Sequence, residues 1–306
     1  MSTIGPMWPT ALHGAHLRRD VVAQAGRHRL AAAIADRAVT PLWAGVVVET
    51  SLLLDPRTRA AAAQLTAGPR AVLSGTTAAF LHGCRSAAGH ETHLHVPYGC
   101  AVRGRRGLIV HQGRWPDEDV RVLDGLRLLA LDRVVADLLC TLPWRGRSRD
   151  ALAILDEALR HAGETSETFR KDVGERLARR HDPRGTRYAA LLLDVGSGRV
   201  ESPAESWMRM ALIEAGVPIP EVNWQILTPD GRELHRLDMA WPGQRICLEY
   251  DGWESHAGRE DADEARAAEL RRHGWIVVRA KGEDLSDPAR LIGELRAAFA
   301  RRGYTW

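Results

Sequence analysis

The chain has 306 residues, of which 45% are hydrophobic and 26% are charged, and its formal net charge is +3. This length suffices for two domains with buried cores, and the composition is typical of a globular protein. A run of about 18 apolar residues, which a transmembrane helix needs, does not occur, and the first residues lack the pattern of a signal peptide. The four cysteines are widely spaced and form no CxxC pair, so neither structural zinc nor a disulfide framework is expected, and a reducing cytoplasm fits best.

The charges are distributed unevenly along the chain. Residues 1–200 carry 28 basic and 20 acidic side chains, whereas residues 201–306 carry 14 and 19. Long-range attraction to nucleic acid is therefore expected to come mainly from the N-terminal part.

Residues 1–70 are predicted to be mainly helical. An amphipathic pattern rich in alanine and arginine extends from about residue 17 to 38, and a short apolar strand over 42–48 follows. A helix and then a strand is how a small winged helix-turn-helix ends, but the pattern shows no clear recognition helix. A degenerate winged helix is therefore one interpretation. A further helix is predicted over 57–65.

Residues 71–195 are predicted to form an α+β domain. Ser74 is a suitable N-cap for a helix that includes residues 78–81. Strands are expected over 93–96, 108–111 and 120–128, and helices over 131–142, 149–161, 165–180 and within 184–198. His93 and His95 alternate on a strand and match no zinc pattern, so we expect ordinary core or strand histidines.

Residues 196–306 are predicted to form a separate domain with the element order αβββαβα. Ser202 and Pro203 are typical of a helix start, and Gly216 is typical of its end. Strands are expected from residue 223 to 227, on both sides of residues 242–245 and over 275–280, with helices over 260–273 and 288–301. The overall prediction is an α/β fold.

Acidic residues alternate with apolar ones in the sequence LHRLDMAWPGQRICLEYDG, residues 234–252. This period of two predicts a hairpin. A two-residue turn at Gly243 and Gln244 would place Asp238 directly across from Glu249, with Asp251 on the same face. Like charges at this spacing destabilise a sheet unless a cation such as Mg²⁺ compensates them. The alternative is an exposed sheet face on which the acids are solvated or paired with arginines.

The order of the elements and their acids resembles the PD-(D/E)XK nuclease superfamily, and most closely its very-short-patch-repair-like family. The resemblance covers about residues 200–302. The matching residues are Glu205 in SPAESWMRMAL, Asp238 in RLDMAW, Glu249 and Asp251 in LEYDG, His256, Arg266, and Arg279 in GWIVVRAKGEDLSDP.

The resemblance implies a restriction-endonuclease-like αβββαβ core that hydrolyses phosphodiester bonds with Mg²⁺ or Mn²⁺. Glu205, Asp238 and Glu249 would bind the metal, which would polarise the phosphodiester and activate water. Arg279 would contact phosphate. Each of three residues has an alternative interpretation. Glu205 would be a first-turn acid favoured by the helix dipole. Arg266 would form a structural ion pair, and Arg279 would pack or form an ion pair.

Asp251 is a departure from the superfamily pattern, which has lysine at this position. Its presence means that another group orients the attacking water or that cleavage is lost. His256 is the nearest candidate acid or base, with a surface histidine as the alternative. The resemblance therefore supports two hypotheses: a cytoplasmic metal-dependent DNA endonuclease acting in defence or repair, and a non-catalytic regulator that binds DNA or a protein.

The N-terminal part is similar to AbiEi-type antitoxin proteins in AVLSGTTAAFLHG, in the strands around THLHVPYG and in LDRVVADLLCTL. That similarity implies a winged-helix module before the following domain, and a toxin as partner. Arg103, Arg105 and Arg106 would contact a phosphate backbone, whereas a solvated loop is the alternative interpretation.

Overall fold

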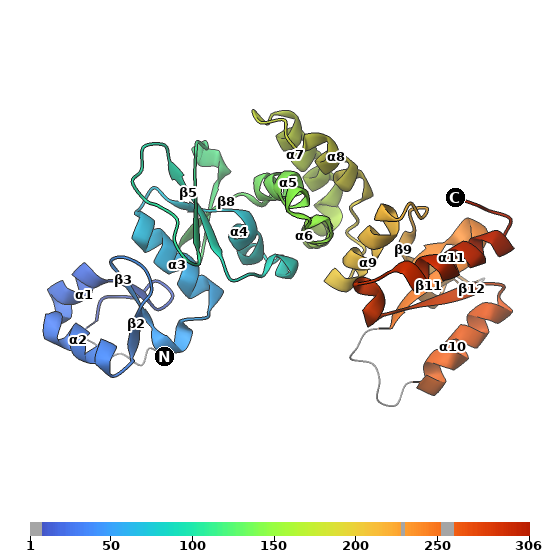
Figure 1. Cartoon of the computed structure of the whole chain (residues 1–306), viewed down its shortest axis with the longest axis horizontal. Coiled ribbons are helices and arrows are strands. Elements are labelled where there is room, and N and C mark those ends of the chain that lie inside the picture. Colours follow the sequence, from blue (N-terminus) through green and yellow to red (C-terminus); the bar gives the residue numbers. More distant parts are fainter. Residues whose placement is uncertain (1–7, 228–229, 252–259) are drawn as a thin grey trace. The chain divides into compact units, whose positions relative to one another are not determined.

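The computed structural model describes residues 8–227, 230–251 and 260–306 (Figure 1). The predicted α/β class is confirmed, and the strands described form three sheets. The chain divides into two compact units, residues 1–138 and 139–306. None of the described helices combines the length and the hydropathy that a membrane span requires.

The division into units differs from the predicted boundaries near residues 70 and 195. Residue 70 lies inside the first unit, because the helix before it packs against strands that follow it. Residue 195 lies inside the second unit, because helices on either side of it pack together. Both predicted boundaries therefore lie within a compact unit, and the finer division into domains stays a prediction.

The first unit begins with a small sheet and three helices. Its elements are β1 (Ala15–Leu17), α1 (Arg18–Ala25), α2 (Arg27–Ala35), β2 (Val39–Pro41), β3 (Val46–Glu49) and α3 (Pro56–Ala67). The antiparallel sheet has the order β1-β3-β2, and Val21, Leu30, Val39 and Val47 form a core between it and the helices α1 and α2. This strand order and the paired helices resemble a winged helix-turn-helix.

Two local predictions in this region are wrong. The single helix expected over 17–38 is two helices, because Gly26 separates them with φ +86° and ψ 154°, a conformation that residues with a Cβ rarely adopt. The strand expected over 42–48 begins only at Val46, and residues 42–45 connect β2 to β3.

The rest of the first unit is a five-stranded sheet with the order β6-β5-β4-β8-β7. Its elements are β4 (Val72–Leu73), α4 (Gly75–Leu81), β5 (Thr92–Pro97), β6 (Leu108–Gly113), β7 (Val120–Leu123) and β8 (Leu126–Leu129). The single strand expected over 120–128 is a hairpin, because Asp124 and Gly125 both have positive φ, as a type I′ turn requires. Helix α5 (Leu131–Thr141) follows.

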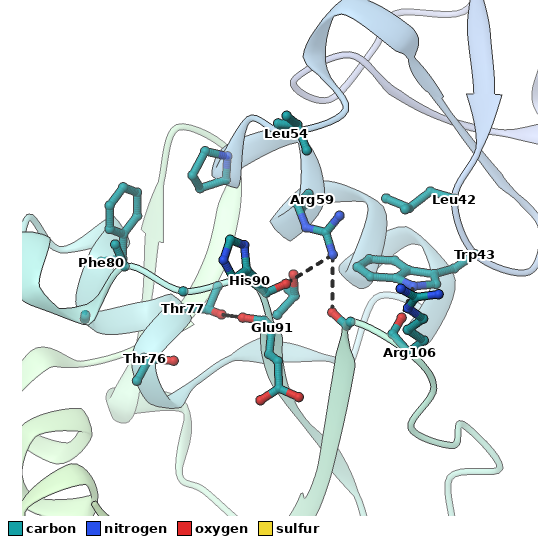
Figure 2. Close-up of a pocket in the computed structure, with 16 residues that line it drawn as sticks. Leu42, Trp43, Leu54, Arg59, Thr76, Thr77, Phe80, His90, Glu91 and Arg106 are labelled. Carbon is teal, nitrogen blue, oxygen red and sulfur yellow. Dashed lines mark hydrogen bonds between the residues drawn. The ribbon is translucent and has the colours of Figure 1, made fainter. Parts of the chain in front are cut away.

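Side-chain contacts tie the two sheets of the first unit together (Figure 2). From α3, Nη2 of Arg59 donates to the carbonyls of His90 and Gly107, at 3.3 and 3.5 Å. The indole of Trp43, in the β2–β3 connection, donates to the carbonyl of Arg106 at 3.3 Å. The small sheet is thereby anchored to the loop that leads into β6.

The second unit starts with helices α6 (Ser148–Ala162), α7 (Ser166–Ala178) and α8 (Thr186–Val195). The remaining elements follow the predicted order αβββαβα: α9 (Pro203–Glu214), β9 (Glu221–Leu227), β10 (Glu233–Trp241), β11 (Ile246–Asp251), α10 (Glu260–Arg272), β12 (Ile276–Lys281) and α11 (Ala289–Arg301). The sheet order is β12-β11-β10-β9, with β11 and β12 parallel and the other pairs antiparallel.

Helices cover both faces of this sheet. On one face, Met208 of α9 and Leu295 of α11 pack against Met239 and Leu248. On the other face, Leu270 of α10 packs against Leu237, Ala240 and Cys247. Leu237 and Met239 therefore belong to different clusters, although they were predicted to share a face. The sheet is buried on both sides around the predicted acidic patch.

Candidate functional site

The predicted register between the two acidic strands is confirmed. Met239 pairs with Leu248, Ala240 with Cys247 and Trp241 with Ile246, which is the register predicted for these residues. The described pairs end at Met239, so the position of Asp238 across from Glu249 stays a prediction. The turn is different from the expected one. Pro242–Gln244 form a 3-10 turn that ends at Arg245, whose φ of +51° is left-handed, so the connection is longer than a two-residue turn.

Asp238 lies partly buried on β10. Its Oδ2 accepts a hydrogen bond of 2.9 Å from the backbone N–H of Tyr250 on β11. Burial raises the pKa of Asp238, and the positive charges of Arg266 and Arg236 oppose that rise. Burial thus makes ionisation of the Asp238 carboxyl unfavourable, and the two arginines offset only part of this effect.

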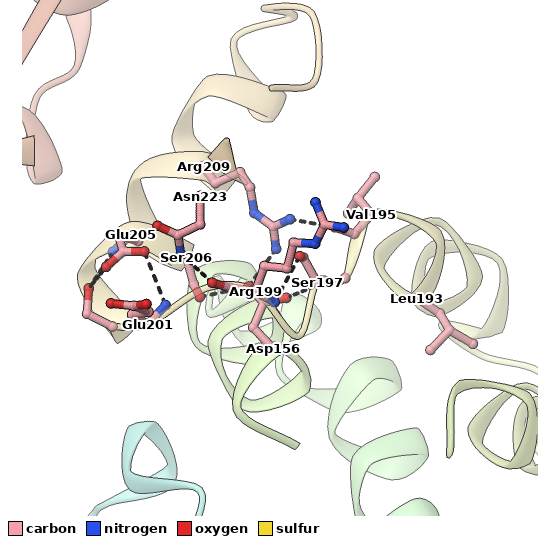
Figure 3. Close-up of polar contacts among 12 residues, drawn as sticks. Asp156, Leu193, Val195, Ser197, Arg199, Glu201, Glu205, Ser206, Arg209 and Asn223 are labelled. Carbon is pink, nitrogen blue, oxygen red and sulfur yellow. Dashed lines mark hydrogen bonds and ion pairs between the residues drawn. The ribbon is translucent and has the colours of Figure 1, made fainter. Parts of the chain in front are cut away.

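Glu205 lies in the first turn of α9, where Ser202 is the N-cap (Figure 3). One carboxylate oxygen accepts from the Ser202 hydroxyl at 2.7 Å, and the other accepts from the backbone N–H of Glu201 at 3.2 Å. Burial raises the pKa of Glu205, and the charge of Asp238 adds to the rise. The charge of Asp238 therefore acts on Glu205, while the same carboxylate also stabilises the helix start.

Glu249 forms an ion pair. Its Oε1 lies 2.7 Å from Nη2 of Arg266, a residue of α10, and the same nitrogen donates to the carbonyl of Arg236 at 2.6 Å. The structural ion pair expected for Arg266 is thus observed. Arg236 in turn pairs with Glu201 at 2.9 Å. Glu201 and Glu249 therefore form one network of ion pairs and hydrogen bonds with Arg236 and Arg266.

These contacts bear on whether Glu205, Asp238 and Glu249 could together bind a metal ion. Among the residues that the structure describes, no three or more histidines, cysteines or acids are placed to hold one ion. Of the three predicted ligands, Glu249 is engaged by Arg266, whereas no ion pair is seen for Glu205 and Asp238 in the described residues. In the described residues one of the three predicted ligands is held by an arginine, and the three-carboxylate metal site stays a prediction.

Two predicted residues cannot be placed in the site. His256 lies outside the described residues. The backbone of Asp251 ends β11 in register with Lys281 of the parallel strand β12, but its side chain lies outside the described part. A lysine is therefore brought beside the strand position at which the superfamily has one, though from a different strand.

The predicted nucleic-acid contacts are separated in the chain. Arg279 on β12 pairs with Glu264 of α10 at 3.2 Å, which is the alternative expected for it. Arg103, Arg105 and Arg106 are exposed in the loop between β5 and β6 of the first unit. Their role as phosphate contacts stays a prediction.

A basic, exposed helix start in the first unit was not predicted from the sequence. Arg27, His28 and Arg29 form the first turn of α2 and are all exposed, whereas Leu30 is buried beneath them. The signal was Gly26 in the sequence QAGRHR, which marks a break between two helices. Apolar residues continue on both sides of Gly26, with Val21 before it and Leu30 after it. The hydrophobic pattern therefore looks like that of one continuous helix.

Comparisons with known proteins show the family to which the chain belongs. No family model matches it. Two proteins of Mycobacterium tuberculosis, the uncharacterized protein MT2308 of strain CDC 1551 and the uncharacterized protein Rv2248 of strain H37Rv, are each 32% identical to it over 281 residues. The match covers 88% of this chain and 95% of each relative. The chain belongs to the family of these two proteins.

The 281 matched residues exceed the length of either compact unit, so the match includes parts of both units. Among solved structures, the RV2827C protein from Mycobacterium tuberculosis aligns with 71% of this chain and 84% of its own, at a TM-score of 0.41 and 16% identity. A similarity this weak supports no argument about function.

Proposed function

We propose that the chain is a cytoplasmic DNA-binding regulator that reads DNA with α2 and does not cleave it. The observation that carries the proposal is the exposed start of α2, Arg27-His28-Arg29, beside the β1-β3-β2 sheet. In helix-turn-helix proteins, the N-terminal residues of the second helix contact base edges in the major groove. The free cysteines of the described chain agree with a reducing compartment.

The surroundings of α2 support a DNA contact. Between residues 18 and 38 the chain has five arginines and two aspartates, and every one of these side chains is exposed. Ala31, Ala32 and Ala35 are exposed on the outer part of α2, and such small side chains allow a helix to approach the groove closely. Arginine pairs bidentately with guanine and also neutralises phosphate.

The C-terminal site supports the non-cleaving part of the proposal. Nη2 of Arg266 lies 2.7 Å from Oε1 of Glu249, so this carboxylate is already engaged by a cation. Asp251 stands where the nuclease superfamily has lysine. A toxin or another protein partner, which the N-terminal resemblance implies, fits the same regulatory role.

The test is selection of bound sequences from random DNA duplexes, followed by affinity measurement with the enriched site. Arg27→Ala/Arg29→Ala should weaken specific binding by at least about tenfold, since each base contact contributes about 1–3 kcal/mol. The double variant Arg70→Ala/Arg85→Ala removes the same charge from exposed positions outside α2 and should bind nearly as the wild type. Failure to enrich any sequence, or equal losses in both double variants, contradicts the proposal.

Metal-dependent cleavage is the second candidate. Glu205 and Asp238 favour it, because both are partly buried acids whose pKa is raised and whose charges repel each other. Lys281 in register with Asp251 also favours it. A site of this kind would hydrolyse a phosphodiester bond, as the superfamily resemblance implies.

Cleavage assays separate the two candidates. Plasmid, linear duplex DNA and RNA are incubated with the protein and Mg²⁺ or Mn²⁺, and wild type is compared with Asp238→Asn. We expect no product above that of the variant. Cleavage by wild type that Asp238→Asn abolishes would replace the regulator with a nuclease.

A further inference from the structure

The first unit contains a cavity of about 750 Å³ that the proposed DNA contact does not use. Its walls come from the β2–β3 connection, the start of α3, α4 and the loops that lead into β5 and β6 (Figure 2). Small-molecule sites typically measure about 300–1,000 Å³ and combine apolar walls with a few polar groups. The cavity has the size and the mixed lining of such a site.

Apolar side chains form most of the wall. Leu42, Trp43, Leu54 and Phe80 line the cavity. Leu54 is 86% exposed, although it is a large aliphatic residue at the rim. An occupant with an apolar body would remove this surface from water.

Arg59 is the central polar group of the cavity. Its guanidinium lies 5.5 Å from the ring centroid of Trp43, and Nη2 donates to two carbonyl groups at the long end of the hydrogen-bond range. A Cβ at Gly107 would lie 2.8 Å from Nη2, so only glycine allows this position of the guanidinium. The cation is therefore held in place by an aromatic ring and by backbone, with further N–H donors left over.

The charge of Arg59 is not compensated by an acid. It has no ion pair with any residue that the structure describes, and burial lowers its pKa. Glu91 lines the cavity, but its carboxylate points away from Arg59 in Figure 2 and lies 4.0 Å from His93 Nε2. Arg106 adds a second, exposed cation to the lining.

We propose that this cavity binds a small organic monocarboxylate, whose carboxylate pairs with Arg59 and whose apolar body packs on Trp43, Leu54 and Phe80. A guanidinium forms strong, charge-assisted hydrogen bonds with a carboxylate, and a partly desolvated one forms them more strongly still. A single negative charge fits better than several, because Glu91 repels a polyanion such as a nucleotide. The site is independent of the DNA-binding proposal.

The experiment is calorimetric titration of the full chain with benzoate, 2-naphthoate and octanoate at up to millimolar concentration, without DNA. We expect saturable binding of at least 2-naphthoate with one site per chain. The neutral analogue 2-naphthamide should bind at least about tenfold more weakly, because it lacks the charge-assisted contact.

Variants locate the binding site. Arg59→Met should weaken 2-naphthoate at least about tenfold. Leu54→Glu changes an exposed side chain, so the fold is preserved, and it should also weaken binding by placing a like charge at the rim. Val122→Glu is the matched control, because Val122 is 63% exposed in the same unit and does not line the cavity.

Four results of these titrations would each overturn the proposal, and a fifth comes from a nucleoside phosphate. They are saturable binding by none of the three acids, equal affinity for the acid and its amide, wild-type affinity in a folded Arg59→Met variant, and equal losses in Leu54→Glu and Val122→Glu. Tighter binding of a nucleoside phosphate than of all three acids would also overturn it, because the cavity would then be a polyanion site.

Discussion

At the scale of single residues, one buried ion pair joins two helices of the second unit. Asp156 on α6 and Arg209 on α9 are only 1% and 2% exposed at their side chains and lie 2.5 Å apart (Figure 3). The Ser206 hydroxyl and the backbone N–H of Ser197 also donate to Asp156, both at 2.7 Å, and Arg209 donates to the carbonyl of Val195 at 2.7 Å. The pair fixes α9, which carries Glu205, against the preceding helices.

Asp156→Ala should destabilise the second unit by about 3–5 kcal/mol, because it leaves the Arg209 guanidinium buried without its partner. Asp156→Leu/Arg209→Met should cost much less, since the charge and its partner are removed together. The measurement is chemical unfolding of each variant. Asp150→Ala, which removes a partly exposed ion pair with Arg147, is the control and should change stability by less than about 1 kcal/mol. Equal destabilisation by the single and double variants of the buried pair would contradict this account.

At the scale of elements, β5 and β6 bring three histidines together. His95 pairs with His111 in the parallel register, and their rings stack with centroids 5.0 Å apart. Nδ1 of His93 lies 3.3 Å from Nε2 of His111. Burial, together with the nearby charges of His111, Arg133 and His93, lowers the pKa of His95 to about 4. The strand pairing therefore holds His95 neutral at physiological pH.

Acid should selectively destabilise the first unit. The pKa of His95 is about 4 in the folded chain and about 6.5 in the unfolded chain, so the unfolded chain binds more protons between these values. Stability is full above pH of about 6.5 and falls as the pH decreases towards about 4, by up to about 3 kcal/mol. Unfolding measured across this range should show the slope, and His95→Phe should reduce it. An unchanged slope in a folded His95→Phe variant would assign the effect to another group.

Helix α2 illustrates how one glycine changes the interpretation of a whole region. The sequence pattern joins residues 17–38 into one amphipathic helix, whereas Gly26 divides it and leaves Arg27 at the start of a second helix. The Asp124-Gly125 dipeptide acts in the same way by dividing a strand into a hairpin. Both breaks depend on backbone conformations with positive φ, which hydrophobic periodicity does not report.

At the scale of the whole molecule, each of the two compact units has its own core. Units with separate cores can unfold separately. We expect two transitions in scanning calorimetry, of which acidification lowers the one that belongs to residues 1–138. Asp156→Ala should lower the other. A single transition that both changes shift together would show that the units unfold as one.

The sequence by itself determined the α/β class, the order αβββαβα, the start of α9 at Ser202 and the register of β10 with β11. These features depend on neighbouring residues: caps, turn residues and the alternation of apolar side chains. Only the tertiary structure decided which charges meet. Arg266 reaches Glu249 from α10, and Arg209 reaches Asp156 from α9. Such partners are far apart in sequence, so the packing of helices against the sheet and against each other, rather than any local pattern, places them in contact.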